Sequence, residues 1–150
     1  MTKPIPDGYR TLTPAVFVDG GLAAIDFYQR AFGADVVRKV VVGDKVISAE
    51  LRIGDSMFQL NDPLPQFGLA APATGGGDSA AILIYTEDVD GMHARAVEAG
   101  AEVINMPEDR FHGNRSGALR DPFGHRWAIV KQVEELSEDE MLQRIKQAMA

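Results

Sequence analysis

The sequence predicts an α+β chain in which two βαβββ modules are followed by a C-terminal helix. Three observations favour this fold class: an internal repeat, helix-boundary residues at matching places in the two copies, and strand-like alternation after each helix. The repeat relates AFGADVV (residues 31–37) to EAGAEVI (residues 98–104), about half a chain length further on. Such self-similarity indicates that one structural unit occurs twice.

Each copy opens with a short apolar run and continues into a helix. Asp19 and Asp88 follow these runs, where a carboxylate can accept hydrogen bonds from the free N–H groups of a helix N-terminus. Gly33 and Gly100 close the helical stretches, where a left-handed C-cap residue is common. The predicted opening strands and helices span residues 14–18 and 20–32 in the first copy, and residues 81–86 and 89–99 in the second.

The segments after each helix have the pattern of strands. β-branched residues and alternation predict three strands in each copy, and Gly43-Asp44 and Gly54-Asp55 supply the turns of the first. The strands span residues 35–42, 45–53 and 56–61 in the first copy, and residues 101–106, 116–120 and 125–132 in the second.

We expect one domain over residues 9–133, followed by a C-terminal helix in residues 134–150. The modules of this domain cover residues 9–62 and 80–133 and are joined by the linker 63–79, which is rich in proline and glycine. Ser137 and Glu140 have the spacing of a capping box and predict where the last helix begins.

The charge balance excludes several classes of partner. The 150 residues contain 15 Lys and Arg against 22 Asp and Glu, a net charge of −7. Nucleic acids and anionic membranes attract surfaces of the opposite sign, so we expect neither as a partner. No apolar run is long enough to span a membrane, and no secretory signal is evident, which favours a cytoplasmic protein. The lack of cysteine excludes disulfides and thiolate chemistry.

Two motifs carry a resemblance to a known superfamily. The helix segment AIDFY (residues 24–28) and the turn DPFGHRW (residues 121–127), within paired βαβββ modules, resemble the vicinal oxygen chelate superfamily of glyoxalase I, bleomycin-resistance proteins, fosfomycin-resistance enzymes and extradiol dioxygenases. The segments AELRIGD (49–55), EDRFHGNRSG (108–117) and VEELS (133–137) resemble its PhnB-like subgroup. The resemblance covers nearly all of residues 9–140. It implies a mixed sheet cupped round a small-molecule site.

The resemblance also implies where a divalent metal would bind in such a cup. It places Thr13 and Ala81 at the two first-strand ligand positions, and Gln59 and Ala128 at the two last-strand positions. Only Gln59 carries a suitable donor, because alanine has none and a lone hydroxyl is a poor ligand. We therefore expect no metal and no other cofactor.

A displaced metal site is the alternative. It would use Gln59 with Glu50 from the neighbouring strand and His112 from the 111–115 loop. We expect the other two histidines to be structural. His93 is predicted to lie on the exposed face of its helix, and His125 to cap or pack against the preceding turn.

Strand alternation predicts which side chains line the cup, because alternate residues point to opposite faces. The candidate ligand-binding residues are Phe17, Glu50, Arg52, Gln59, Tyr85, His112 and Arg115. Glu50 is also the candidate catalytic residue, as a general base if burial raised its pKa. The alternative is that Glu50 forms an ion pair with Arg52 or Arg115, or faces solvent. Phe17 and Tyr85 either sandwich a flat ligand or pack within the sheets, while Trp127 is expected in the core.

Three functions remain open from the sequence. The first is a binding protein that holds a small aromatic or cationic molecule in a metal-free cup, which the negative charge favours. The second is a lyase, isomerase or dioxygenase type of enzyme that uses Glu50 or a displaced metal. The third is a dimerisation or regulatory domain with a vestigial cup. Edge strands that need covering, together with the resemblance, predict a homodimer.

Overall fold

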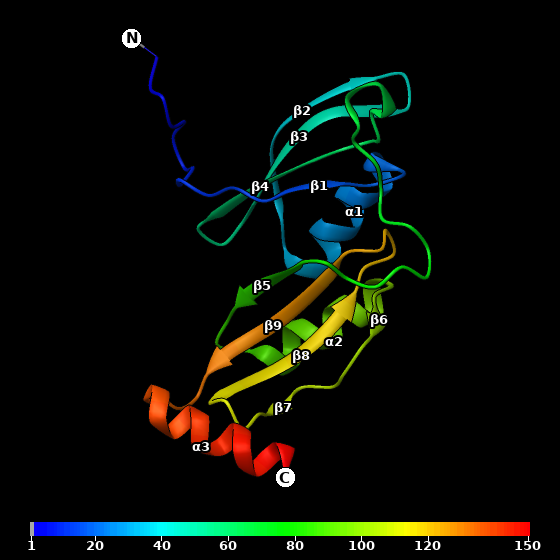
Figure 1. The fold of residues 1–150 in the computed structure, drawn as a ribbon. Helices are drawn as coiled ribbons and strands as arrows, with labels where there is room; N and C mark the ends of the chain where they lie inside the picture. The colour runs from blue at the N-terminus through cyan, green and yellow to red at the C-terminus, as the bar shows by residue number, and fades with distance from the viewer. Residues whose placement is uncertain (1) are drawn as a thin grey trace.

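The computed structural model describes residues 2–150 and contains two β-sheets, each with a helix packed on one face (Figure 1). In the first sheet the strand order is β1-β4-β3-β2, with β1 parallel to β4 and the other pairs antiparallel. The elements of this module are β1 (Ala15–Phe17), α1 (Gly21–Phe32), β2 (Asp35–Val42), β3 (Lys45–Ile53) and β4 (Ser56–Asn61).

The second sheet repeats this topology in the order β5-β9-β8-β6, and a further short strand, β7, also pairs with β8. Its elements are β5 (Ala81–Tyr85), α2 (Val89–Ala99), β6 (Glu102–Val103), β7 (Glu108–Asp109), β8 (Asn114–Arg120) and β9 (Arg126–Gln132). A 3-10 turn, η1 (Pro65–Phe67), lies between the modules, and α3 (Glu138–Met149) follows them. The predicted fold class, two βαβββ modules with a C-terminal helix, is confirmed.

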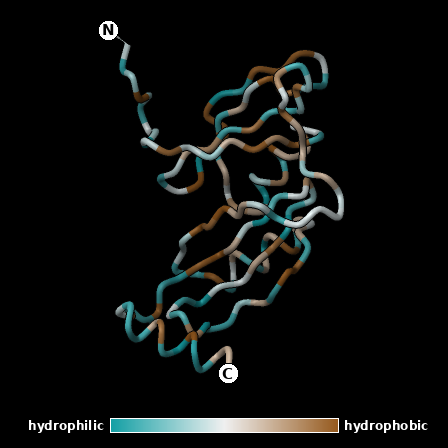
Figure 2. Tube along the Cα trace, in the orientation of Figure 1, coloured by the Kyte–Doolittle hydropathy of each residue, from teal (hydrophilic) through white to brown (hydrophobic). Residues whose placement is uncertain are grey.

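One hydrophobic core joins the two modules, because α1 packs against α2 and both sheets pack against these helices. Trp127 lies at its centre, 1% exposed, with its ring centroid 4.8 Å from that of Phe32 on α1. Trp127 is therefore a core residue, as the alternation of β9 predicts. In Figure 2 the hydrophobic stretches of the chain lie mainly in the strands, whereas α3 is mainly hydrophilic.

The two helix starts differ, and the prediction for the first was wrong. Asp88 caps α2 as expected, since its carboxylate accepts from the Gly91 N–H at 2.9 Å. Asp19 does not cap α1. Asp62, at the end of β4, accepts instead from the Gly20 and Gly21 N–H groups at 2.9 and 3.1 Å. The start of α1 is therefore capped by Asp62, from a distant part of the sequence, and not by the adjacent Asp19.

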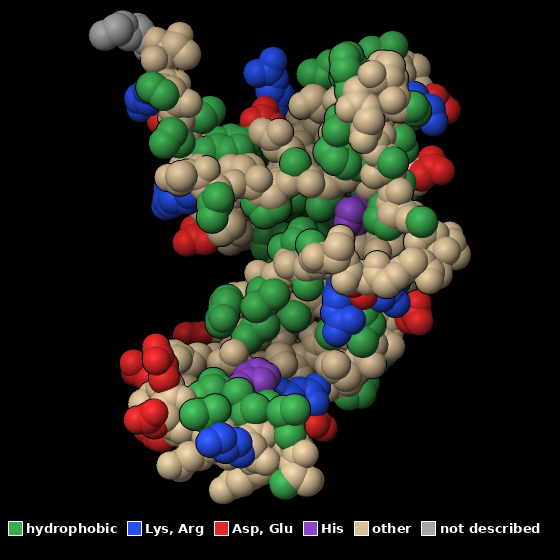
Figure 3. All heavy atoms as spheres, viewed as in Figure 1, with side chains coloured by type: hydrophobic (Ala, Val, Ile, Leu, Met, Phe, Trp, Pro, Cys, Tyr) green, Lys and Arg blue, Asp and Glu red, His purple; other side chains and the backbone are tan. Residues whose placement is uncertain are grey.

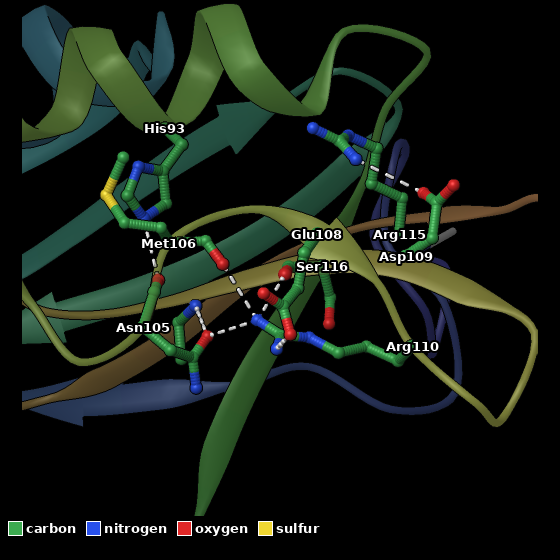
Figure 4. A network of polar contacts seen from close by, with 9 residues as sticks. His93, Asn105, Met106, Glu108, Asp109, Arg110, Arg115 and Ser116 are labelled. Carbon is green, nitrogen blue, oxygen red and sulfur yellow. Dashed lines mark hydrogen bonds and ion pairs between the residues drawn. The ribbon is translucent and has the colours of Figure 1, made fainter.

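The predicted strand 101–106 was wrong beyond β6, because the ladder with β8 becomes irregular there. The N–H groups of Ile104 and Asn105 both donate to the Ala118 carbonyl, at 3.0 and 3.2 Å, and side chains bond to other groups of β8. Asn105 Oδ1 accepts from the Ala118 N–H at 2.9 Å, and the Arg110 guanidinium donates to the Ser116 carbonyl at 2.9 Å. Figure 4 shows Arg110 reaching across to Asn105, Met106, Glu108 and Ser116. Between β6 and β7, side-chain bonds therefore supplement irregular backbone bonds to β8.

The prediction that His93 is exposed was also wrong. His93 is 2% exposed, and its Nε2 lies 3.2 Å from the Asn105 carbonyl oxygen (Figure 4). It packs over Gly117 of β8, where a Cβ atom would come within 2.7 Å of the imidazole. The missing side chain at Gly117 makes the room that buries this histidine.

The last helix is tied to the second module by one arginine. The Ser137–Glu140 capping box is present, as predicted. Arg144 of α3 pairs with Glu134 at 2.8 Å and donates to the Phe111 carbonyl at 3.0 Å. The division into a domain of residues 9–133 and a separate helix in 134–150 stays a prediction. No helix among residues 2–150 combines the length and apolar character needed to cross a membrane.

Candidate functional site

The site candidates lie on the open faces, by which we mean the face of each sheet opposite its helix. On the first sheet, strand register places Ala15, Gln59, Glu50 and Arg38 side by side across β1, β4, β3 and β2. The intervening apolar residues of β3 and β4 are buried against the helices. In Figure 1 the open face of the second sheet is toward the viewer, with α2 behind it.

Both open faces carry exposed apolar side chains. Leu83 and Tyr85 of β5 are 50% and 64% exposed, and Val40 of β2 is 42% exposed. Figure 3 shows hydrophobic side chains gathered over both sheets and a hollow between the two modules. No helix or strand among residues 2–150 covers either open face, although the N-terminal segment contacts that of the first sheet through Tyr9.

Three side chains meet on the open face of the first sheet, and we call them the Tyr9–Glu50–Gln59 cluster. The Tyr9 hydroxyl donates to Glu50 Oε1. Gln59 Nε2 donates to the same hydroxyl at 3.3 Å. All three residues are partly buried. Burial raises the pKa of Tyr9, and its hydrogen bond to the Glu50 carboxylate raises that pKa further. The Tyr9 phenol therefore stays neutral, and its hydroxyl lies between the Glu50 carboxylate, which accepts from it, and the Gln59 amide, which donates to it.

Neither arginine that could have paired with Glu50 does so. Arg52 shares the open face but lies 3.6 Å from Asp35. Arg115 projects to the helix side, where it pairs with Asp90 of α2 at 2.8 Å and with Asp109 at 3.2 Å. These two carboxylates raise the pKa of Arg115. The structure therefore separates Arg115 from Glu50.

The remaining candidates are spread over the molecule. Phe17 lies on the open face of the first sheet, and its carbonyl oxygen is 2.9 Å from His125 Nε2. Tyr85 lies on the open face of the second sheet, opposite Val130. His112 is in the loop before β8, with its ring centroid 5.5 Å from that of Phe111. The first sheet thus brings together Phe17, Glu50, Arg52 and Gln59, but not Tyr85, His112 or Arg115.

Sequence reasoning missed Tyr9. Its segment precedes β1 and has no periodicity of its own, so alternation says nothing about where the ring points. The one available signal was an aromatic residue within an otherwise proline-rich and polar N-terminal stretch, a few residues before the first strand.

The side chains at the four family ligand positions do not fit a divalent metal ion. The Gln59 amide is engaged with the Tyr9 hydroxyl. Ala128, the matching position in the second sheet, is in register with Leu83, and neither carries a donor. No group of three or more His, Cys, Asp or Glu side chains converges within residues 2–150. That the protein binds no metal stays a prediction.

A second polar feature lies where the linker crosses the end of the second sheet. Asp78 pairs with Arg120 and, at 3.3 Å, with Arg126. Burial opposes ionisation of Asp78, but the bonds from these arginines outweigh it and lower its pKa. A broad crevice of about 1410 Å³ lies beneath this part of the linker, between the two modules. These ion pairs hold the linker to the second sheet and occupy the guanidinium groups of Arg120 and Arg126.

Comparison with known proteins gives a consistent result. A family model described as the Glyoxalase/Bleomycin resistance protein/Dioxygenase superfamily matches residues 12–129. An uncharacterized protein of Mycobacterium bovis is 40% identical over 134 residues, which cover 87% of this chain and 88% of that one. An uncharacterized protein of Arabidopsis thaliana is 30% identical over 118 residues, covering 72% of this chain and 69% of that one.

Solved structures share the fold. The X-ray structure of an Arabidopsis thaliana gene product has a TM-score of 0.65 at 27% identity and covers 81% of this chain and 98% of that chain. TioX from Micromonospora sp. ML1 has a TM-score of 0.64 at 20% identity, covering 85% of this chain and all of that one. With its paired βαβββ modules and the family match over most of its length, the chain belongs to the glyoxalase/bleomycin resistance/dioxygenase superfamily.

Proposed function

We propose that this chain is a binding protein that holds a small aromatic or cationic molecule on the open face of its first sheet, without a metal. The proposal rests on the burial and the hydrogen-bond partner of Glu50. Its carboxylate sits part-buried on an open sheet face, and within residues 2–150 its partner is the Tyr9 hydroxyl rather than a cation. A carboxylate without a cation attracts a hydrogen-bond donor or a positive group.

The surroundings of Glu50 suit such a molecule. Phe17 and Gln59 share its face and offer an aromatic surface and an amide. The net charge of −7 favours approach of a cation over that of an anion. The motif in residues 108–117 supports assignment to the PhnB-like subgroup.

We also propose that the binding unit is a homodimer. The exposed apolar residues of β2 and β5 lie on open faces that a second copy would cover. Covering them would also enclose the ligand between two chains. Tyr85, remote from Glu50 within one chain, would then line a cup completed by the partner.

An enzyme of lyase or isomerase type is the second candidate, and the Tyr9–Glu50 hydrogen bond favours it. A phenol and a carboxylate in contact can pass a proton to and from a bound molecule. Glu50 would act as the base and Tyr9 as the acid.

A thermal-shift screen with aromatic amines, phenols and 2-oxo compounds tests the binding proposal. A ligand bound to the native state raises the melting temperature. We expect that rise in the wild type and in Glu98→Gln, an exposed α2 control, and its loss in Glu50→Gln. Equal shifts in all three proteins would remove Glu50 from the site. Turnover of a hit, lost in Glu50→Gln, would favour the enzyme.

A further inference from the structure

The N-terminal arm, residues 2–12, is hydrogen-bonded to the first sheet through one side chain. Residues 2–8 are exposed, and Figure 1 shows them running away from both sheets. Their hydrogen bonds are local, such as Lys3 to Asp7 at 2.7 Å and Tyr9 N–H to the Pro6 carbonyl at 3.1 Å. Among the described residues of the arm, Tyr9 alone forms side-chain hydrogen bonds to the sheet, to Glu50 and Gln59.

Tyr9 therefore occupies the place where a ligand would meet Glu50. A hydroxyl group both donates and accepts hydrogen bonds, whereas an ammonium group only donates. In the cluster the Tyr9 hydroxyl uses both capacities, toward the carboxylate of Glu50 and the amide of Gln59. A molecule that replaces Tyr9 without disturbing these two partners must likewise donate one hydrogen bond and accept another, as a hydroxyl group does at a single atom.

We propose that Tyr9 is a built-in occupant of the binding site, and that the natural ligand is a phenol or similar hydroxyl-bearing aromatic molecule that displaces it and releases the arm. This inference rests on the proposed function, because it concerns the same open face. Tyr9 sets specificity in two ways. It excludes molecules that bind Glu50 more weakly than its own phenol, and it makes arm release a consequence of binding.

The first test uses 4-methylphenol, which reproduces the tyrosine side chain, with toluene as the analogue that lacks the hydroxyl. In Tyr9→Ala the occupant is gone, so 4-methylphenol should bind about tenfold more tightly than to the wild type, as one charge-assisted hydrogen bond allows. Toluene should gain nothing. Phe67→Ala removes a ring that is 72% exposed from η1, between the modules, and should bind 4-methylphenol like the wild type.

The second test follows the arm itself. Tyr9→Phe keeps the ring and removes the hydroxyl, so trypsin should cut after the exposed Arg10 about tenfold faster than in the wild type. Saturating 4-methylphenol should speed the same cut in the wild type and not in Tyr9→Phe. Melting temperatures establish that both Tyr9 variants are folded.

Each outcome decides the inference. Equal 4-methylphenol affinity in wild type and Tyr9→Ala, equal gains for toluene, or unchanged cleavage in Tyr9→Phe would each overturn it. If ligands from the screen still depend on Glu50 in that event, the binding site stands and only the role of Tyr9 is lost. If Tyr9→Ala gains 4-methylphenol binding while the wild type binds nothing in the screen, the occupant is right and the proposed function is wrong.

Discussion

The hydroxyl of Tyr28 on α1 donates a hydrogen bond to Asp121, in the turn between β8 and β9, and so joins the two modules through their shared core. Both residues are buried. Trp127 Nε1 donates to the same carboxylate at 2.8 Å, and the N–H groups of Phe123 and His125 reach its other oxygen at 2.9 and 3.0 Å. Burial, and then the charge of Asp121, raise the pKa of Tyr28 well above its ordinary value.

Removing Asp121 should therefore destabilise the whole chain. Asp121→Ala leaves a buried phenol, an indole N–H and two backbone N–H groups without their acceptor, and should lower the free energy of unfolding by about 3 kcal/mol or more. Tyr28→Phe removes one donor and should cost about 1–2 kcal/mol. Urea unfolding measures both. An Asp121→Ala loss no larger than that of Tyr28→Phe would contradict the shared-acceptor role.

Asp62 should make the first module acid-sensitive. Burial raises its pKa, but bonds from the N–H groups of Val46, Gly20 and Gly21 outweigh burial and lower the pKa below the ordinary 3.8. Its stabilisation is therefore complete above pH 3.8 and is lost as the pH falls through the lower folded-state pKa. Asp62→Asn should cost about 2 kcal/mol at neutral pH. That difference should shrink in acid.

The control for this pH dependence is Asp44→Asn, in the exposed turn between β2 and β3. It should match the wild type in urea unfolding at every pH. A constant difference between wild type and Asp62→Asn down to strongly acidic pH would show that the carboxylate charge is not what holds the start of α1.

Gly117 should tolerate no side chain. An added Cβ would lie 2.7 Å from His93 Cδ2 and 2.9 Å from the Pro107 nitrogen. Gly117→Ala should therefore lower the free energy of unfolding by about 1–3 kcal/mol. Gly77→Ala, in the linker where nothing lies within 4 Å of the new atom, should be neutral. Thermal unfolding of the two variants is the comparison, and equal melting temperatures would contradict the packing of His93 on β8.

The proposed homodimer should depend on the open face of β5. Light scattering should give twice the chain mass of 16.3 kDa for the wild type. Leu83→Asp places a charge on that face and should yield monomers, whereas Val97→Asp, on the exposed side of α2, should stay dimeric. A wild-type monomer at micromolar concentration, or a dimeric Leu83→Asp, would count against this interface.

Metal independence is a separate prediction. With Gln59 the one good donor at the family positions, EDTA should leave the melting temperature unchanged, because no native-state metal ligand is removed. Elemental analysis should find no stoichiometric divalent metal. A stoichiometric metal that is lost in Glu50→Ala or His112→Ala would establish the displaced site and make the enzyme the better explanation.

Regular elements were predictable wherever a local pattern specifies them. The strands Asp35–Val42, Lys45–Ile53 and Ser56–Asn61 begin and end where alternation and glycine turns predict. The capping residue Asp88 also acts within one helical turn of its own position. Such features depend on neighbours in the chain, so the sequence alone carries them.

The predictions that were wrong depend on residues far apart in the chain. Asp62 replaces Asp19 at α1 because β4 ends beside that helix, and His93 is buried because Gly117 leaves room for it on β8. In the same way, the regular ladder on β8 stops after β6 because two backbone N–H groups converge on the Ala118 carbonyl and the side chains of Asn105 and Arg110 bond to β8. Periodicity carries no information on any of these contacts.

The candidate site also combines residues that a local pattern places with contacts that only the tertiary structure decides. Strand alternation was sufficient to place Phe17, Glu50, Arg52 and Gln59 on one face, since the side-chain period of a strand is two. The bond from Tyr9 to Glu50, and the diversion of Arg115 to Asp90, were decided by tertiary structure. The N-terminal arm has no residue pattern that fixes where it crosses the sheet. The long side chain of Arg115 pairs with whichever carboxylate the packing of α2 brings within reach.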